Sequence, residues 1–222
     1  SIVDVSKDFV VDATARYEKY SDFGNAVIGK LSGKLKVNEE LTLRSSLSSG
    51  FRAPSLAQIY TEKNQYSFSG GTILVTGILN NVSSDAEKLG IAKLKAEKST
   101  NFTLGLGYKP TPDTSLTVDY YNITMKDRIV LGSVLGPTGN ANQAIDQVLK
   151  TREWVGLSFF ANALDSKTSG IDYVFNQRNI KLGDVKFGFN LSGNYTIENE
   201  RDGAVKNPAG IANAGKSVLD PT

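Results

Sequence analysis

The chain has 222 residues, enough for one sizeable domain or two small ones, and a formal net charge of +2. A charge this balanced argues against nucleic-acid binding, which usually shows as a strongly basic patch or domain. The sequence has no cysteine and no histidine, which excludes disulfides, thiolate metal sites and the Ser-His-Asp triad. We therefore expect no metal site and no cofactor, and only a carboxylate-based or lysine-based enzyme would remain.

Three runs of alternating apolar and polar residues occupy the first quarter of the chain, at 9–18, 27–37 and 41–48. Such alternation predicts strands with one apolar and one polar face. Short turns are expected between them, at Ser21–Gly24 and Asn38–Glu40. Strands joined by turns this short must pair antiparallel.

The alternation then stops in a long polar segment, Phe51–Lys95, which is rich in serine, asparagine and glycine. Loops of this length are uncommon in compact domains and are usually functional or disordered. We expect a long loop without regular strands here.

The alternation resumes in the middle of the chain. Strands are predicted at Phe102–Tyr108 and from Ser115 to about Leu131, with a turn at Thr111–Thr114. The next segment, Gly132–Val155, has helical spacing in its centre, which predicts a short amphipathic helix packed on its own loop. The apolar positions with this spacing are Ala141, Ala144, Ile145, Val148 and Leu149.

Two more strands are predicted near the end of the chain. One runs from roughly Leu157 to Arg178, with an expected interruption near Ser166. A turn at Asn179–Asp184 leads to the most regular strand, which starts at Val185 and ends at Glu198. The remainder, 199–222, is expected to be loop.

About seven strands thus alternate between short turns at one end and long loops at the other, with the short turn Ser21–Gly24 as the exception at the long-loop end. A strand of about twelve residues, at ~3.3 Å each, is long enough to cross a bilayer with a tilt. A lysine facing lipid at mid-membrane costs about 2–4 kcal/mol, so Lys30, Lys34 and Lys36 should face a lumen or rim, and Leu31 and Leu35 should face lipid. A soluble β-sandwich gives the same alternation, so the alternation alone does not decide between a soluble fold and a membrane barrel.

Four motifs resemble, in order, the barrel of TonB-dependent outer-membrane receptors. They are GFRAPS (Gly50–Ser55), LKAEKS (Leu94–Ser99), LTVDYYNITMKDRI (Leu116–Ile129) and SKTSGIDYVFNQ (Ser166–Gln177). Alanine at position 96 replaces the proline usual in the second motif. The resemblance extends from about Tyr17 to Tyr195.

This resemblance implies an all-β fold: an antiparallel up-and-down meander of about seven strands from a large transmembrane β-barrel, with long extracellular loops and one short loop helix. Residues 1–222 would form a partial β-barrel domain, with the plug domain and its TonB box before Ser1 and the closing strands after Thr222. The implied function is TonB-energised uptake of a scarce nutrient (a siderophore, vitamin or oligosaccharide) across the bacterial outer membrane. The expected partners are TonB through the plug, the nutrient at the extracellular loops, and outer-membrane lipid.

Haem is disfavoured as the cargo. Haem importers with a similar FRAP motif carry a histidine in the loop that follows, and Phe51–Lys95 has none. The second box of those importers, Asn-Pro-Asn-Leu, reads Ile-Ala-Lys-Leu at Ile91–Leu94.

Arg52, Tyr60, Tyr66, Phe68 and Trp154 are the candidate ligand-binding residues of the loops. Aromatic side chains near acidic residues suit a sugar or a cationic ligand, although such residues also serve as loop packing or as an interfacial belt. Arg52 can instead have a structural role. It ends a strand shortly before a proline and can fix that strand end through charge-assisted bonds.

The sequence leaves two alternatives to a transport receptor. One is a soluble β-rich binding or adhesion module. The other is a surface enzyme of carbohydrate metabolism. Its only support is an acid pair such as Asp165 and Asp172. A transport receptor without enzymatic activity is the prediction that the motifs favour.

Overall fold

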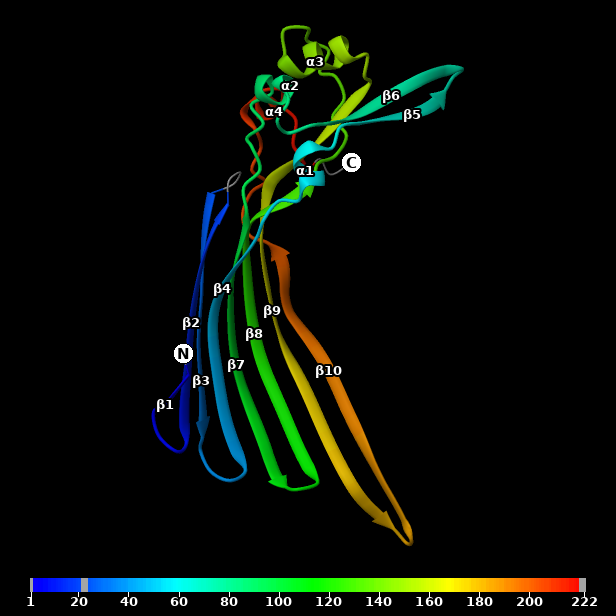
Figure 1. Ribbon diagram of the computed structural model, residues 1–222. Coiled ribbons are helices and arrows are strands. Elements are labelled where there is room, and N and C mark those ends of the chain that lie inside the picture. The colour runs from blue at the N-terminus through cyan, green and yellow to red at the C-terminus, as the bar shows by residue number, and fades with distance from the viewer. Residues whose placement is uncertain (1, 21–23, 220–222) are drawn as a thin grey trace. The chain divides into compact units, whose positions relative to one another are not determined.

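The computed structural model describes residues 2–20 and 24–219. These residues form ten strands and four short helices, which fall into two compact units. We call them the sheet unit (Ser1–Phe51, Lys98–Met125 and Ser166–Glu200) and the loop unit (Arg52–Glu97, Lys126–Asp165 and Arg201–Thr222). Figure 1 shows the strands and helices of both units.

Seven long strands and the short β1 run through the sheet unit, and several of the long strands have residues in both units. They are β1 (Ile2–Asp4), β2 (Phe9–Tyr20), β3 (Gly24–Lys36), β4 (Leu41–Arg52), β7 (Glu97–Thr111), β8 (Thr114–Leu131), β9 (Gly156–Leu182) and β10 (Val185–Arg201). Their order is β1-β2-β3-β4-β7-β8-β9, and β10 also pairs with β9. The seven predicted strands are confirmed as a meander. The short strand β1 was not predicted.

The register places apolar residues of neighbouring strands on one face of the sheet and polar residues on the other. Leu31 lies opposite Ala13 on one side and Leu47 on the other, and Lys34 lies opposite Arg44. Both registers are antiparallel, as the short turns predicted. The apolar face is open rather than covered, since Leu31 is 55% exposed and Leu47 is 52% exposed.

The turns follow from local chemistry. The side-chain oxygen of Asn38 accepts hydrogen bonds from the backbone N–H groups of Glu40 (2.9 Å) and Leu41 (2.7 Å), which closes the turn between β3 and β4. Gly183 adopts φ +61° between β9 and β10, a value that suits glycine. The turn expected at 21–24 lies mostly outside the described residues.

Two expectations for the last third of the chain are wrong. β9 runs without interruption past Ser166, and the serine itself is buried. The segment after 198 is not all loop, since β10 extends to Arg201 and α4 (Ala209–Ala212) follows.

The long segment between β4 and β7 is also more regular than predicted. It contains α1 (Leu56–Tyr60), a hairpin of β5 (Lys63–Ser69) and β6 (Thr72–Leu79), and α2 (Ser84–Lys88). The hairpin turns through two glycines, Gly70 and Gly71, with φ of +58° and +79°, which tight two-residue turns require. The end of β6 pairs parallel with the start of β9, an exception to the antiparallel meander.

The hydrophobic core lies in the loop unit and explains why its loop segments are folded. Its fully buried large side chains are Leu79, Leu89, Leu135, Ile145, Leu157, Phe159, Ile211 and Val218. They come from several loop segments, and each side chain contributes ~1.5–3 kcal/mol on burial. The predicted amphipathic helix is confirmed as α3 (Ala144–Arg152), which buries Ile145, Val148 and Leu149 in this core. None of the helices in the described ranges is long and apolar enough to cross a membrane.

Candidate functional site

Arg52, a predicted ligand contact, ends β4 and forms an ion pair with Glu97, the first residue of β7. Its guanidinium donates from Nε to Oε2 (2.6 Å) and from Nη2 to Oε1 (2.7 Å), the two-pronged geometry that suits arginine and a carboxylate. The Glu97 carboxylate also accepts the backbone N–H of Ile129 (2.7 Å) and is 3% exposed. The pair therefore closes the base of the long loop, while the arginine side chain itself stays 58% exposed.

The strand ends at Arg52 for the reason that the motif predicted. Pro54 lacks an N–H for sheet pairing, so the chain leaves the sheet and α1 begins at Leu56. Ser55 caps this helix in a capping box with Gln58, whose side chain returns a bond to the backbone of the serine.

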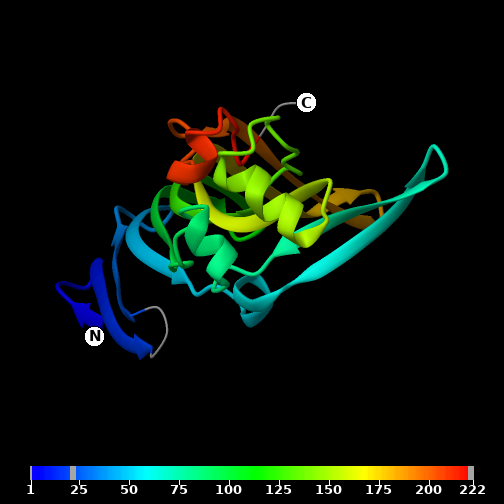
Figure 2. The same cartoon turned by 90° about the horizontal axis from the view of Figure 1, so that it is seen from above.

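Tyr60, Tyr66 and Phe68 are exposed, as ligand-contacting side chains would be. Tyr60 ends α1, whereas Tyr66 and Phe68 alternate along β5 and so point to the same face of the hairpin. Phe68 is 80% exposed, a large value for a phenylalanine. In both views the hairpin extends away from the helices of its own unit (Figures 1 and 2).

Trp154 lies in the core of the loop unit and is 6% exposed. Its ring lies against Gly77 of β6, where an added Cβ would come within 2.4 Å of ring atoms, and the Arg152 guanidinium stacks 5.3 Å from the ring centroid. Its burial thus separates this residue from the three exposed aromatic side chains and leaves little of its ring for a ligand to contact.

Arg152 links three segments of the loop unit. It donates to Asp85 of α2 (2.8 Å) and to Glu62 between α1 and β5 (2.6 Å). Burial by itself raises the pKa of the Asp85 carboxyl, but hydrogen bonds from Lys88 and Arg152 outweigh burial and hold that pKa below its ordinary value. Glu62 directly precedes β5, so this pair of salt bridges fixes the base of the hairpin.

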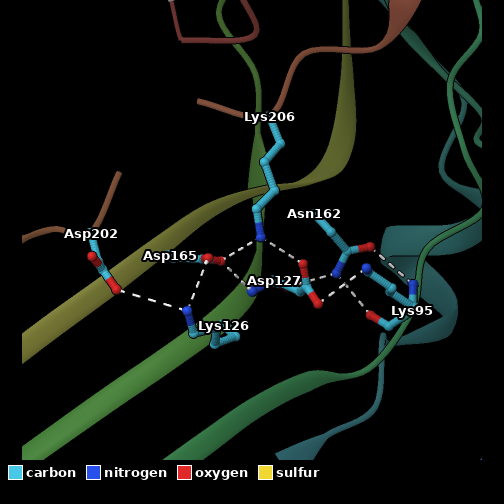
Figure 3. Close-up of polar contacts among 7 residues, drawn as sticks. All are labelled: Lys95, Lys126, Asp127, Asn162, Asp165, Asp202 and Lys206. Atoms are coloured by element: carbon cyan, nitrogen blue, oxygen red, sulfur yellow. Dashed lines mark hydrogen bonds and ion pairs between the residues drawn. The ribbon is translucent and has the colours of Figure 1, made fainter. Parts of the chain in front are cut away.

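A second charged cluster, drawn in Figure 3, was not predicted. The Lys206 ammonium lies between two carboxylates, 2.8 Å from Asp127 and 2.6 Å from Asp165. Both carboxylates raise the pKa of Lys206, so it stays charged. The cluster continues through Lys95 on Asp127 (3.1 Å) and through Lys126, which lies 3.8 Å from Asp165.

Asn162 of β9 supports the same cluster through the backbone. Its side chain donates to the carbonyl oxygens of Lys95 (2.8 Å) and Asp127 (2.6 Å) and accepts the N–H of Lys95 (2.9 Å). Asp127 adopts a left-handed φ of +56°, and its N–H donates to the Asp165 carboxylate at 2.8 Å. The cluster thus ties the end of the long loop and the final loop to β8 and β9. The individual residues gave no signal of it, because these contacts join positions far apart in the sequence.

The acid pair that argued for an enzyme is not an isolated pair in the structure. Asp165 belongs to the loop unit and is held by lysines. Asp172 belongs to the sheet unit and accepts a hydrogen bond from the Asn194 amide at 2.7 Å. Each carboxylate therefore has its own partners.

Several solved structures are similar to the chain. The siderophore receptor PirA from Pseudomonas aeruginosa has 19% identity and a TM-score of 0.61 over 88% of this chain and 32% of that one. The ferric enterobactin receptor PfeA has 18% identity and a TM-score of 0.59, with 87% and 25% covered. The RagAB peptide importer has 16% identity and a TM-score of 0.53, with 86% and 21% covered. At these identities the likeness concerns the fold.

The chain spans about a third or less of the length of these structures. No curated protein matches its sequence. The family described as "TonB dependent receptor-like, beta-barrel" matches residues 2–220. The chain therefore belongs to the TonB-dependent receptor β-barrel family, as the GFRAPS and LKAEKS motifs indicated.

Proposed function

We propose that the chain forms part of the barrel wall and the outer loops of a bacterial outer-membrane receptor, which imports a scarce nutrient with energy supplied through TonB. The observation that carries this proposal is the match of nearly the whole chain to the receptor-barrel family. In this proposal TonB acts through a plug domain that lies outside the 222 residues.

The two faces of the sheet unit support a membrane location. The face with Leu31 and Leu47 is apolar and open, as a lipid-facing surface would be. The opposite face carries Lys34, Arg44 and Asp119, and an ion pair joins Arg44 to Asp119 across β7 (Nε to Oδ1, 2.9 Å). Charges are costly at mid-membrane on the lipid side, so this polar face lines the lumen.

The ligand side of the proposal rests on the loop unit. Tyr60, Tyr66 and Phe68 offer exposed aromatic surface. Arg52, earlier in the same loop segment, offers a partly exposed guanidinium. We propose these four residues as ligand contacts and a siderophore, vitamin or oligosaccharide as the nutrient. The names of the similar structures include siderophore, ferric enterobactin and peptide, which supports nutrient import as the general role.

Uptake by cells that express the full-length receptor tests the proposal. An iron-labelled siderophore panel, labelled cobalamin and labelled oligosaccharides would each be supplied to cells with and without TonB. We expect uptake of one class to require both the receptor and TonB, and to fall in a Tyr66→Ala/Phe68→Ala double variant. TonB-independent uptake of every class, or a receptor found only as a soluble protein, would contradict the proposal.

A further inference from the structure

The hairpin of β5 and β6 has an outer strand edge with which no described residue pairs. Within the described ranges β5 is the last strand of the sheet order and pairs only with β6. All seven of its residues are exposed. Natural edge strands usually avoid pairing through proline, inward charges or a covering segment, whereas β5 has no proline and a single charge, Lys63, at its first position.

The turn determines which backbone groups point outward. In a hairpin closed by two residues, the pair beside the turn, here Ser69 and Thr72, exchanges hydrogen bonds, and every second pair along the strands does the same. The N–H and C=O groups of the intervening residues, Asn64, Tyr66 and Phe68, therefore point to the open edge. These groups are the ones that another strand would pair with.

Side chains on one face add an apolar stripe beside this edge. Tyr66 lies opposite Val75 and Phe68 lies opposite Ile73, so four apolar side chains share one face. Phe68 and Ile73 remain exposed at 80% and 55%. Main-chain pairing with side-chain pockets on alternate positions is the general mode by which sheet edges bind extended peptides.

The base of the hairpin is held firmly, so the edge is ready before a partner arrives. Four residues of β6 pair with β9, and the N–H of Val155 donates to the carbonyl of Val75 at 2.8 Å. Trp154 lies against Gly77 at the same level. A preorganised edge loses less conformational entropy on binding than a mobile loop would.

We propose that the outer edge of β5 binds an extended peptide from the surroundings by adding it as a further strand, with Tyr66 and Phe68 contacting its alternate side chains. The proposal rests on the proposed function and goes beyond it, because a peptide is a ligand class outside the siderophores, vitamins and oligosaccharides named there. A peptide fits better than a charged small molecule because β5 offers a row of backbone groups and little charge.

Binding of a fluorescein-labelled pool of random-sequence nonapeptides to the detergent-solubilised full-length receptor tests this. The key variant is Asn64→Pro, which removes one outward N–H yet suits an edge strand, and its matched control is Asn64→Ala, which keeps that N–H. We expect fluorescence anisotropy to show that proline weakens binding about tenfold and alanine leaves it nearly unchanged. Peptides with N-methyl groups on every residue should bind as weakly to the wild type, because neither edge of their backbone keeps an N–H donor.

Hydrogen exchange gives a second readout that a purely structural role of β5 would not change. The peptide pool should slow exchange at the amides of Asn64, Tyr66 and Phe68 in the wild type. No binding at about 1 mM, equal binding to the proline and alanine variants, or protection of these amides by self-association without peptide would overturn the proposal. TonB-dependent uptake of another nutrient without peptide binding would remove this inference and leave the proposed function in place.

Discussion

Among single residues, two ion pairs link strands in different ways, one between neighbouring strands and one across an intervening strand. Arg52 and Glu97, 45 residues apart, join the two motifs that first pointed to the family, and they do so at the base of the long loop. Arg44 and Asp119 instead reach across β7 in the sheet unit, where Gly105 leaves room for them. The first carboxylate is almost fully buried, so loss of its partner costs more than loss of an exposed pair.

Replacement of Arg52 by alanine should destabilise the protein by about 1–3 kcal/mol, because a buried carboxylate loses its paired donors. Arg52→Lys should recover part of the loss, since lysine keeps the charge but not the two-pronged geometry. Thermal unfolding in detergent, followed by circular dichroism, measures both. Lys36→Ala, which removes the exposed Lys36–Glu39 pair, is the control and should change stability by about 0–1 kcal/mol. Equal effects of the two alanine variants would contradict this assignment.

Gly105 and Gly107 offer a matched comparison on one strand. A Cβ at Gly105 would come within 2.0 Å of the Asp119 carboxylate and 2.7 Å of the Arg44 guanidinium, whereas at Gly107 the nearest atom is 3.9 Å away. Gly105→Val should therefore break the ion pair and destabilise by about 1–3 kcal/mol. Gly107→Val should be tolerated. Denaturant unfolding measures the stability of both variants, and equal losses at the two positions would contradict the prediction.

At the scale of elements, the structure shows how the loop segments become ordered. Short helices and a hairpin that are unstable alone are held by a common core and by charged links such as Asp85–Arg152 and the Lys206 cluster. These links involve groups with altered pKa, so they make the order of the loop unit depend on pH in a defined direction.

Acid should loosen the loop unit only below about pH 4. The pKa of Asp85 is lower in the folded state than its ordinary value of 3.8, so its stabilising effect is complete above that value and is lost as pH falls through the folded pKa. Trp154, the only tryptophan of the chain, stacks on Arg152 and reports the change by fluorescence. Asp85→Asn should reduce this acid transition. A transition centred near pH 6, unaffected by that substitution, would refute the assignment.

Lys206 should hold the final loop against β8 and β9. Lys206→Ala leaves the carboxylates of Asp127 and Asp165 without their shared cation, so amide exchange should accelerate in residues 202–219. Lys206→Arg should restore much of the protection, because the positive charge remains. Unchanged exchange in the alanine variant would show that other contacts hold this loop.

The sequence predicted the long strands well because their alternation is a local property. Residues 29–36 and 185–198 alternate regularly, and both segments lie in strands. The order inside Phe51–Lys95 was missed because β6 pairs with β9 and Leu79 and Leu89 pack on residues distant in the sequence. The structural role of Arg52 at the strand end could be predicted from its motif. The Lys206 cluster could not, because it depends on contacts that no local pattern reveals.

For the molecule as a whole, we propose that the sheet unit is a piece of a membrane barrel wall. The claim rests on membership of the receptor-barrel family and on the two faces of the sheet. A soluble module would need its apolar face covered by protein, whereas a barrel would place that face against lipid.

Single-cysteine scanning of residues 27–35 in the full-length receptor tests this claim most directly, since these 222 residues contain no cysteine to interfere. Each cysteine would carry a bimane label, and the receptor would be placed in bilayers that contain lipids with a fluorescence quencher in their acyl chains. Strong quenching at 27, 31 and 35 with weak quenching at 30 and 34 is the predicted result. Equal quenching on both faces, or none at any position, would contradict the membrane-barrel account.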